Sequence, residues 1–206
     1  MSWRRPAEDQ ALIQIVDAAL ADAASRSGDW LACRPGCTQC CIGVFAINVL
    51  DAARLQEGLA HLERAEPERA KRVRQRARDS AARLSAEFPG NAKTGVLAAE
   101  VLKRGSKAER RFADFANDEA CPALDRETGL CDLYSSRPMT CRTFGPPVRA
   151  QDGLGVCELC FEGASDEEIA ACEMIVDPDD LESQLLISMK NGRGSDEQTL
   201  VAFALK

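Results

Sequence analysis

The sequence has very few of the side chains on which histidine-based and aromatic sites depend. It contains one histidine, one tyrosine and two tryptophans among 206 residues, and aromatic residues make up 5% of the chain. A single histidine argues against zinc sites of mixed Cys–His ligation and against any histidine-dependent catalytic triad. We expect His61 on an exposed helix position. The scarcity of aromatic residues means that the core must consist mainly of Leu, Ala, Val and Ile.

Long apolar runs are also lacking. No window approaches the ~18 apolar residues that a membrane-spanning helix needs. The first residues lead into an acidic amphipathic stretch and not into the apolar core of a signal peptide, so Arg4-Arg5 does not indicate a twin-arginine signal. We therefore expect a cytoplasmic protein with no membrane partner, in a compartment where thiols stay reduced.

The charge balance excludes a further class of partner. The formal net charge is −7 and the pI is about 4.9. A field of this sign repels nucleic acid and anionic membranes, so we expect neither as a partner. The sequence has no internal repeat and no low-complexity segment, and its length suits a single metal-binding domain over residues 1–206.

Cysteine, in contrast, is abundant, with ten in the chain. The first block contains Cys33, Cys37, Cys40 and Cys41. Two thiolates separated by two residues can reach one metal ion at about 2.3 Å, and Cys37 and Cys40 have that spacing. The adjacent Cys40 and Cys41 point in different directions, so both can bind only if they serve different irons or different metals. Clustered thiols in a reducing compartment indicate metal ligation and not disulfides.

A second block contains Cys121, Cys131, Cys141, Cys157 and Cys160. The turn-like residues 125–129 predict a hairpin that brings Cys121 to Cys131. Pro138 at a helix start would place Cys141 in the first turn, where the helix dipole favours a thiolate. Arg137 and Arg142 could offset the negative charge of the thiolates, and we expect Tyr134 to pack beside the site.

These motifs resemble the YkgJ-type cysteine-cluster family, a zinc- or iron-chelating domain named for its CxxCxxCC pattern. The first block matches the variant with an added residue after its first cysteine. Cys121-Pro122, Cys131, Tyr134 and the Arg137-to-Arg142 segment match the family's second block. The resemblance covers roughly residues 30–48 and 118–163. Relatives include flagellin lysine methylases with an iron–sulfur cluster on these cysteines, but no feature of this sequence supports carrying over methylation.

We predict nine metal ligands: Cys33, Cys37, Cys40, Cys41, Cys121, Cys131, Cys141, Cys157 and Cys160. All-thiolate ligation suits both zinc and an iron–sulfur cluster, and the vicinal pair favours the cluster. The predicted function is redox or electron transfer with an unidentified protein partner. The alternatives are a zinc-stabilised interaction module without catalysis and a protein-modifying, methylase-like enzyme. Cys172 shares an apolar helix face, which indicates a buried structural thiol.

The spacing Cys33-x3-Cys37-x2-Cys40 also matches radical-SAM enzymes. The chain lacks the alternating strands and helices of an α/β barrel, which disfavours that interpretation. We expect the two blocks to meet in one composite site. The alternative is a separate four-cysteine site in the first block, with the remaining cysteines binding a second metal.

The predicted fold is α-rich α+β, a helical frame around a cysteine-rich loop and hairpin. Apolar periodicity predicts a helix over residues 8–24 and a helical insertion over about 50–116, with Pro67 at a helix start and a further helix over 97–116. The segment 199–205 is predicted as a short strand. The basic face of the helix after Pro67 is expected to be solvated, with docking of an acidic partner as the alternative.

Overall fold

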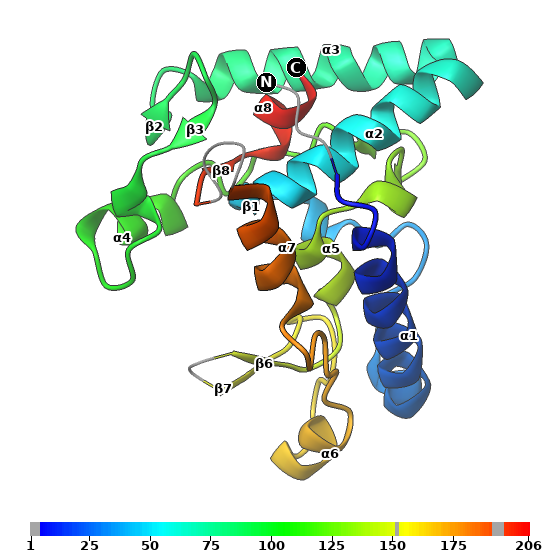
Figure 1. The fold of residues 1–206 in the computed structure, drawn as a ribbon. Coiled ribbons are helices and arrows are strands. Elements are labelled where there is room, and N and C mark those ends of the chain that lie inside the picture. Colours follow the sequence, from blue (N-terminus) through cyan, green and yellow to red (C-terminus); the bar gives the residue numbers. More distant parts are fainter. Residues whose placement is uncertain (1–4, 151–152, 191–195) are drawn as a thin grey trace. The chain divides into compact units, whose positions relative to one another are not determined.

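The structure is a computed structural model that describes residues 5–150, 153–190 and 196–206. It confirms the α-rich α+β fold (Figure 1). The helices are α1 (Asp9–Ser27), α2 (Val49–Ala65), α3 (Pro67–Leu84), α4 (Lys107–Ala113), α5 (Met139–Thr143), α6 (Asp166–Ala171), α7 (Leu181–Lys190) and α8 (Val201–Leu205). None of the helices within the described ranges is long and apolar enough to cross a membrane.

Within the described ranges the strands are short and pair in antiparallel two-stranded ladders. They are β1 (Ile47–Asn48), β2 (Gly90–Asn91), β3 (Val96–Leu97), β4 (Leu124–Asp125), β5 (Leu130–Cys131), β6 (Val148–Ala150), β7 (Gly153–Gly155) and β8 (Gln198–Thr199). β1 pairs with β8, β2 with β3, β4 with β5, and β6 with β7. Because each ladder has only two strands, the helices and not a sheet supply the main packing surfaces.

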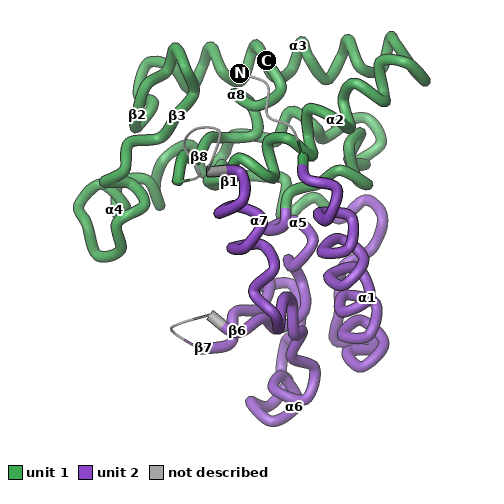
Figure 2. The backbone as a smooth tube through the Cα atoms, in the orientation of Figure 1, with its two compact units in different colours: residues 1–5, 38–138, 192–206 green, residues 6–37, 139–191 purple. Residues whose placement is uncertain are grey.

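The chain forms two compact units (Figure 2). Unit 1 spans residues 1–5, 38–138 and 192–206, and unit 2 spans residues 6–37 and 139–191. The single domain that the sequence suggested stays a prediction. The division falls inside the first cysteine block, so Cys33 and Cys37 belong to unit 2 while Cys40 and Cys41 belong to unit 1.

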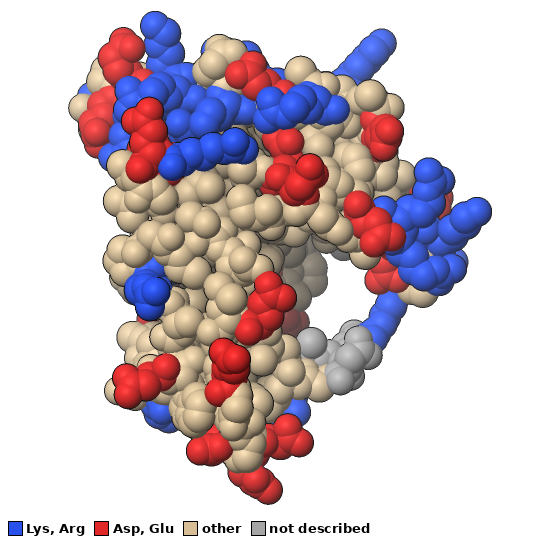
Figure 3. Space-filling model, turned by 180° about the vertical axis from the view of Figure 1, so that it is seen from behind, with Lys and Arg blue, Asp and Glu red and all other residues tan. Residues whose placement is uncertain are grey.

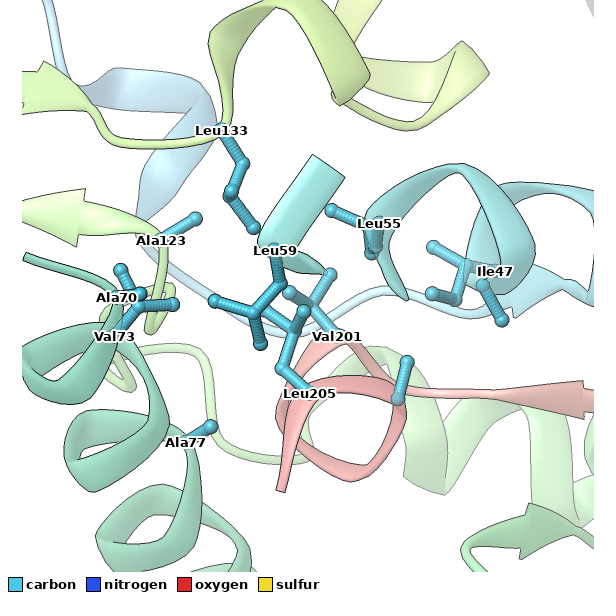
Figure 4. Close-up of a cluster of buried hydrophobic side chains, with 12 residues drawn as sticks. Ile47, Leu55, Leu59, Ala70, Val73, Ala77, Ala123, Leu133, Val201 and Leu205 are labelled. Carbon is cyan, nitrogen blue, oxygen red and sulfur yellow. The ribbon is translucent and has the colours of Figure 1, made fainter. Parts of the chain in front are cut away.

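The core of unit 1 lies among α2, α3 and α8 (Figure 4). Leu59 of α2, Val73 of α3 and Leu205 of α8 are each at most 2% exposed and belong to one apolar cluster. The Asn48 side chain caps α2 by accepting a hydrogen bond from Asp51 N at 2.9 Å. The next helix, α3, begins at Pro67, as predicted, because its missing N–H costs nothing in the first turn. These caps and apolar faces build the helical frame.

Two element predictions were wrong. Residues 97–116 form not one helix but a short 3₁₀ helix at Ala99–Val101 and then α4, separated by Gly105 at φ +73°. Residues 199–205 are mostly helical: β8 ends at Thr199 and α8 follows, with all five of its residues buried. A short apolar run does not distinguish strand from helix by its period, and here packing against α2 and α3 decides the outcome.

Unit 2 is built around α1, which confirms the helix predicted over residues 8–24. α1 packs against α5 and α7, and the buried Arg142 of α5 donates to the Asp17 carboxylate at 2.6 Å. Ser165 and Glu168 form the capping box that begins α6. Beside it lies a small apolar cluster around Phe161, and three cysteines belong to this cluster.

The first testable prediction concerns the unit 1 core. We expect Leu59→Ala to lower the free energy of unfolding by about 2–5 kcal/mol, because it removes buried methyl groups and leaves a cavity. Leu102→Ala is the control, since Leu102 is 38% exposed, and it should cost no more than about 0.5–1 kcal/mol. Urea denaturation followed by circular dichroism measures both. Equal losses would contradict the core position of Leu59.

Candidate metal centre

Backbone hydrogen bonds join the first cysteine block to the second within unit 1. Cys121 N donates to Cys41 O at 2.7 Å, and Gly43 N donates to Glu119 O at 2.9 Å. Ile42 lies between these two bonds in an antiparallel bridge with the residue that precedes Cys121. This short stretch of antiparallel pairing places the backbone of Cys41 beside that of Cys121.

The predicted hairpin then adds Cys131. β4 and β5 pair with Leu124 opposite Cys131, and Asp132 N donates to Ala123 O at 2.7 Å. This register confirms the prediction made from the turn residues 125–129. Because Leu124 follows Cys121 closely in the chain, the hairpin brings the second and third cysteine segments together.

Four thiols consequently gather in unit 1, and we call Cys40, Cys41, Cys121 and Cys131 the unit 1 set. Each interacts electrostatically with the other three. The hydrogen bond between the Cys40 and Cys41 side chains lowers the pKa of Cys40 to about 6 and raises the pKa of Cys41. Burial raises the pKa of Cys121 to about 12. Among the four thiols of the set, only the pKa of Cys40 is lowered, while those of the other three are raised.

Arg137 supplies positive charge to this set. It is 8% exposed. Its charge lowers the pKa of Cys40, although this effect is smaller than that of the hydrogen bond with Cys41. The guanidinium lies 4.0 Å from the centre of the Tyr134 ring, and its Nη1 donates to Tyr134 O at 2.9 Å. Tyr134 is 61% exposed. The Tyr134 ring thus stacks on Arg137 and is largely in solvent, and its packing beside the cysteines stays a prediction.

The basic face of α3 braces the same segment. Lys and Arg side chains gather along the top of the molecule in Figure 3, where α3 lies. The Asp132 carboxylate, 2% exposed, accepts hydrogen bonds from Arg69 Nε and Arg76 Nη2. Arg76 Nε also donates to Pro122 O at 2.8 Å. Since Pro122 follows Cys121 and Asp132 follows Cys131, Arg76 holds both cysteine strands against α3.

The second testable prediction concerns this brace. We expect Asp132→Asn to lower the free energy of unfolding by about 1–3 kcal/mol, because two partly buried guanidinium groups lose their anionic acceptor. Asp118→Asn is the matched control, since Asp118 is exposed, and it should change stability by about 0.5 kcal/mol or less. Urea denaturation gives both values. A silent Asp132→Asn would mean that the arginines do not hold the hairpin.

A second group of thiols gathers in unit 2, and we call Cys33, Cys37, Cys157 and Cys160 the unit 2 set. Burial first, and then the charges of the other three thiols and a hydrogen bond with Cys160, together raise the pKa of Cys33 to about 12. Burial also raises the pKa of Cys157, with contributions from Cys160 and Cys37. Both blocks of the sequence therefore contribute to each set.

The remaining predicted residues lie as follows. Cys141 is the third residue of α5, half-buried, in the first helical turn as expected, and it stays a predicted ligand. Cys172 is 5% exposed in the apolar cluster of Cys157 and Cys160, which confirms its burial. The His61 side chain is 67% exposed, as predicted. Sequence spacing did not reveal that the first block divides after Cys37.

The donor chemistry of both sets fits a thiophilic metal. Within the described ranges, no group of three or more Cys, His, Asp or Glu side chains already stands in an arrangement that could hold a metal ion. Four cysteines are nevertheless the ligand set of structural zinc sites and of iron–sulfur clusters. A cysteine side chain turns about a single dihedral, so the thiols of one set can converge once a cation offsets their mutual repulsion.

Two all-thiol sets, one in each compact unit, define a cysteine-based metal-binding domain. The family model CxxCxxCC, described as a putative zinc- or iron-chelating domain, matches residues 32–161. The chain belongs to this family. No curated protein and no solved structure matches the chain.

Proposed function

We propose that the protein holds an iron–sulfur cluster on the unit 1 set and acts in redox or electron-transfer chemistry with a protein partner. The observation that carries this proposal is the presence of the vicinal pair, Cys40 and Cys41, in one set with Cys121 and Cys131. Adjacent cysteines are poorly placed to bind the same ion, whereas a cluster offers each of them a different iron. Four thiolates are the usual ligands of [2Fe–2S] and [4Fe–4S] clusters.

The surroundings of the set support a redox role. A bound cluster would supply one-electron chemistry at iron. Arg137 would stabilise the thiolates and the more negative, reduced state by its charge. Arg76 and Asp132 would keep two of the ligand strands in place while the charge of the site changes. All-thiol ligation also favours a compartment that keeps cysteines reduced, so we propose a cytoplasmic location.

A second candidate is a zinc-stabilised interaction module without chemistry of its own. It is favoured by two apolar side chains that flank cysteines of the unit 1 set. Ile42 follows Cys41 and is 46% exposed, and Leu130 precedes Cys131 and is 45% exposed. Zinc would fix the backbone that presents these side chains, and a partner would cover them.

The third testable prediction is the metal content of the full-length protein purified without oxygen. We expect iron together with acid-labile sulfide, and a brown colour that a chemical reductant bleaches. Cys121→Ser should lose the iron and sulfide, because it removes one of the four ligands. Cys172→Ser should keep them, since Cys172 is buried in the apolar cluster of unit 2. Serine at both positions changes the same atoms, so the comparison is matched.

Three outcomes decide between the candidates. Iron and sulfide that disappear only in Cys121→Ser support the cluster. Stoichiometric zinc without sulfide in the wild-type protein contradicts the cluster and supports the interaction module. Folded, metal-free protein with oxidised cysteines contradicts both candidates, because neither functions without metal.

A further inference from the structure

The four cysteines of unit 2 come from two chain segments that are joined by their backbones. Phe161 N donates to Trp30 O at 2.9 Å, which ties the segment before Cys33 to the segment after Cys160. The Trp30 and Phe161 rings stack with their centroids 6.5 Å apart. The two segments are therefore fixed against each other by backbone and side-chain contacts that do not involve the thiols.

Each segment presents its cysteines from a tight turn. Cys37 N donates to Arg34 O at 2.9 Å, and Cys160 N donates to Cys157 O at 2.8 Å. The spacings x3 and x2 lie in the range by which a turn supplies two thiolates to one metal ion. The Cys33 side chain is hydrogen-bonded to that of Cys160, so the two turns face each other with a thiol of each in contact.

Gly145 provides the space in which Cys33 lies. A Cβ at this position would stand 2.7 Å from Cys33 Sγ, closer than any unstrained contact, and Gly145 has φ +121°. Gly145 O also accepts a hydrogen bond from Cys157 N at 3.4 Å. One glycine thus contacts both segments, and only a residue without a side chain admits the Cys33 sulfur there.

We infer that Cys33, Cys37, Cys157 and Cys160 form a second metal site, separate from the unit 1 set, that takes a single zinc ion. The inference rests on the proposal that the clustered cysteines ligate metal. It differs in the metal, because the unit 2 set contains no adjacent cysteines and consists of two chelating pairs, which is the ligand pattern of a tetrahedral Cys₄ zinc site. Binding releases the thiol protons to solvent, and the cation replaces their charge.

The burial of one of the two cysteine pairs agrees with a structural role, while in the other pair Cys33 is exposed and Cys37 is half-buried. Cys157 and Cys160 are 6% and 4% exposed and pack with Phe161 in an apolar cluster. A structural zinc site has four protein ligands and no open coordination position, and the four cysteines of the unit 2 set supply that number. The zinc would hold the turn at Cys33 against the turn at Cys160 and so stabilise unit 2.

The fourth testable prediction compares two glycines of unit 2 in the full-length protein. We expect Gly145→Ala to lose about one zinc ion per chain, because the new methyl group displaces Cys33. Gly153→Ala should keep that zinc. Gly153 has φ +128° and nothing within 4 Å of an added Cβ, so it imposes a comparable backbone strain without touching a cysteine. Zinc, iron and sulfide are measured on the same anaerobic preparations.

A cysteine pair provides the second readout. Cys33→Ser should lose the same zinc and keep the iron and sulfide, while Cys172→Ser, in the same apolar cluster, should keep all three. Cobalt(II) offered to wild-type protein after zinc removal should give thiolate charge-transfer bands and the visible bands of a tetrahedral ion. The cobalt measurement needs no variant and therefore still applies if Gly145→Ala fails to fold.

The outcomes separate this inference from the proposed function. Loss of zinc alone in Gly145→Ala and Cys33→Ser supports the unit 2 site, whether or not unit 1 carries iron. A wild-type protein with two zinc ions and no sulfide contradicts the iron–sulfur proposal. The unit 2 site is still supported in that case if Gly145→Ala and Cys33→Ser each lose one of the two zinc ions. Unchanged zinc in both variants, loss of iron and sulfide from Cys33→Ser, or absence of tetrahedral thiolate bands with cobalt overturns the inference.

Discussion

The two hydrogen bonds that pair residues 41–43 with residues 119–121 determine which cysteines meet in unit 1. They connect parts of the chain that are separated by the whole helical insertion. Once Cys121 N is bonded to Cys41 O, the hairpin that follows can only bring Cys131 to the same place, and Cys40 accompanies Cys41. The pairing is short, so it needs support from the elements around it.

That support comes from the insertion itself. α3 lies against the hairpin, and three of its arginines bind carboxylates next to the cysteines: Arg69 and Arg76 hold Asp132, and Arg83 holds Glu119. Arginine suits this task because its planar guanidinium can bond a carboxylate and a carbonyl at once. Much of the basic surface over α3 is thus engaged within unit 1, which weakens the case for a docking face.

The energetics of the thiols explain why metal and fold depend on each other. Four neutral thiols are inexpensive to pack together, since cysteine behaves as a small apolar residue. Four thiolates at the same positions repel one another, which is the reason that charge on one thiol raises the pKa of its neighbours. A metal ion removes that repulsion, so its binding energy contributes directly to folding. In unit 1 the charge of Arg137 offsets part of the repulsion between thiolates.

The sequence by itself determined the local features of this protein. The turn at 125–129 predicted the hairpin, Pro67 predicted a helix start, and the spacing of the cysteines predicted metal ligation, because each depends on residues close together in the chain. The grouping of the cysteines was decided only by the tertiary structure. Cys37 and Cys40 have the spacing of a chelating pair, yet Cys37 gathers with Cys157 and Cys40 with Cys121, since long-range backbone pairing and not local spacing selects the partners. For the same reason the apolar segment 201–205 became a helix: its conformation follows from the buried faces of α2 and α3 against which it packs.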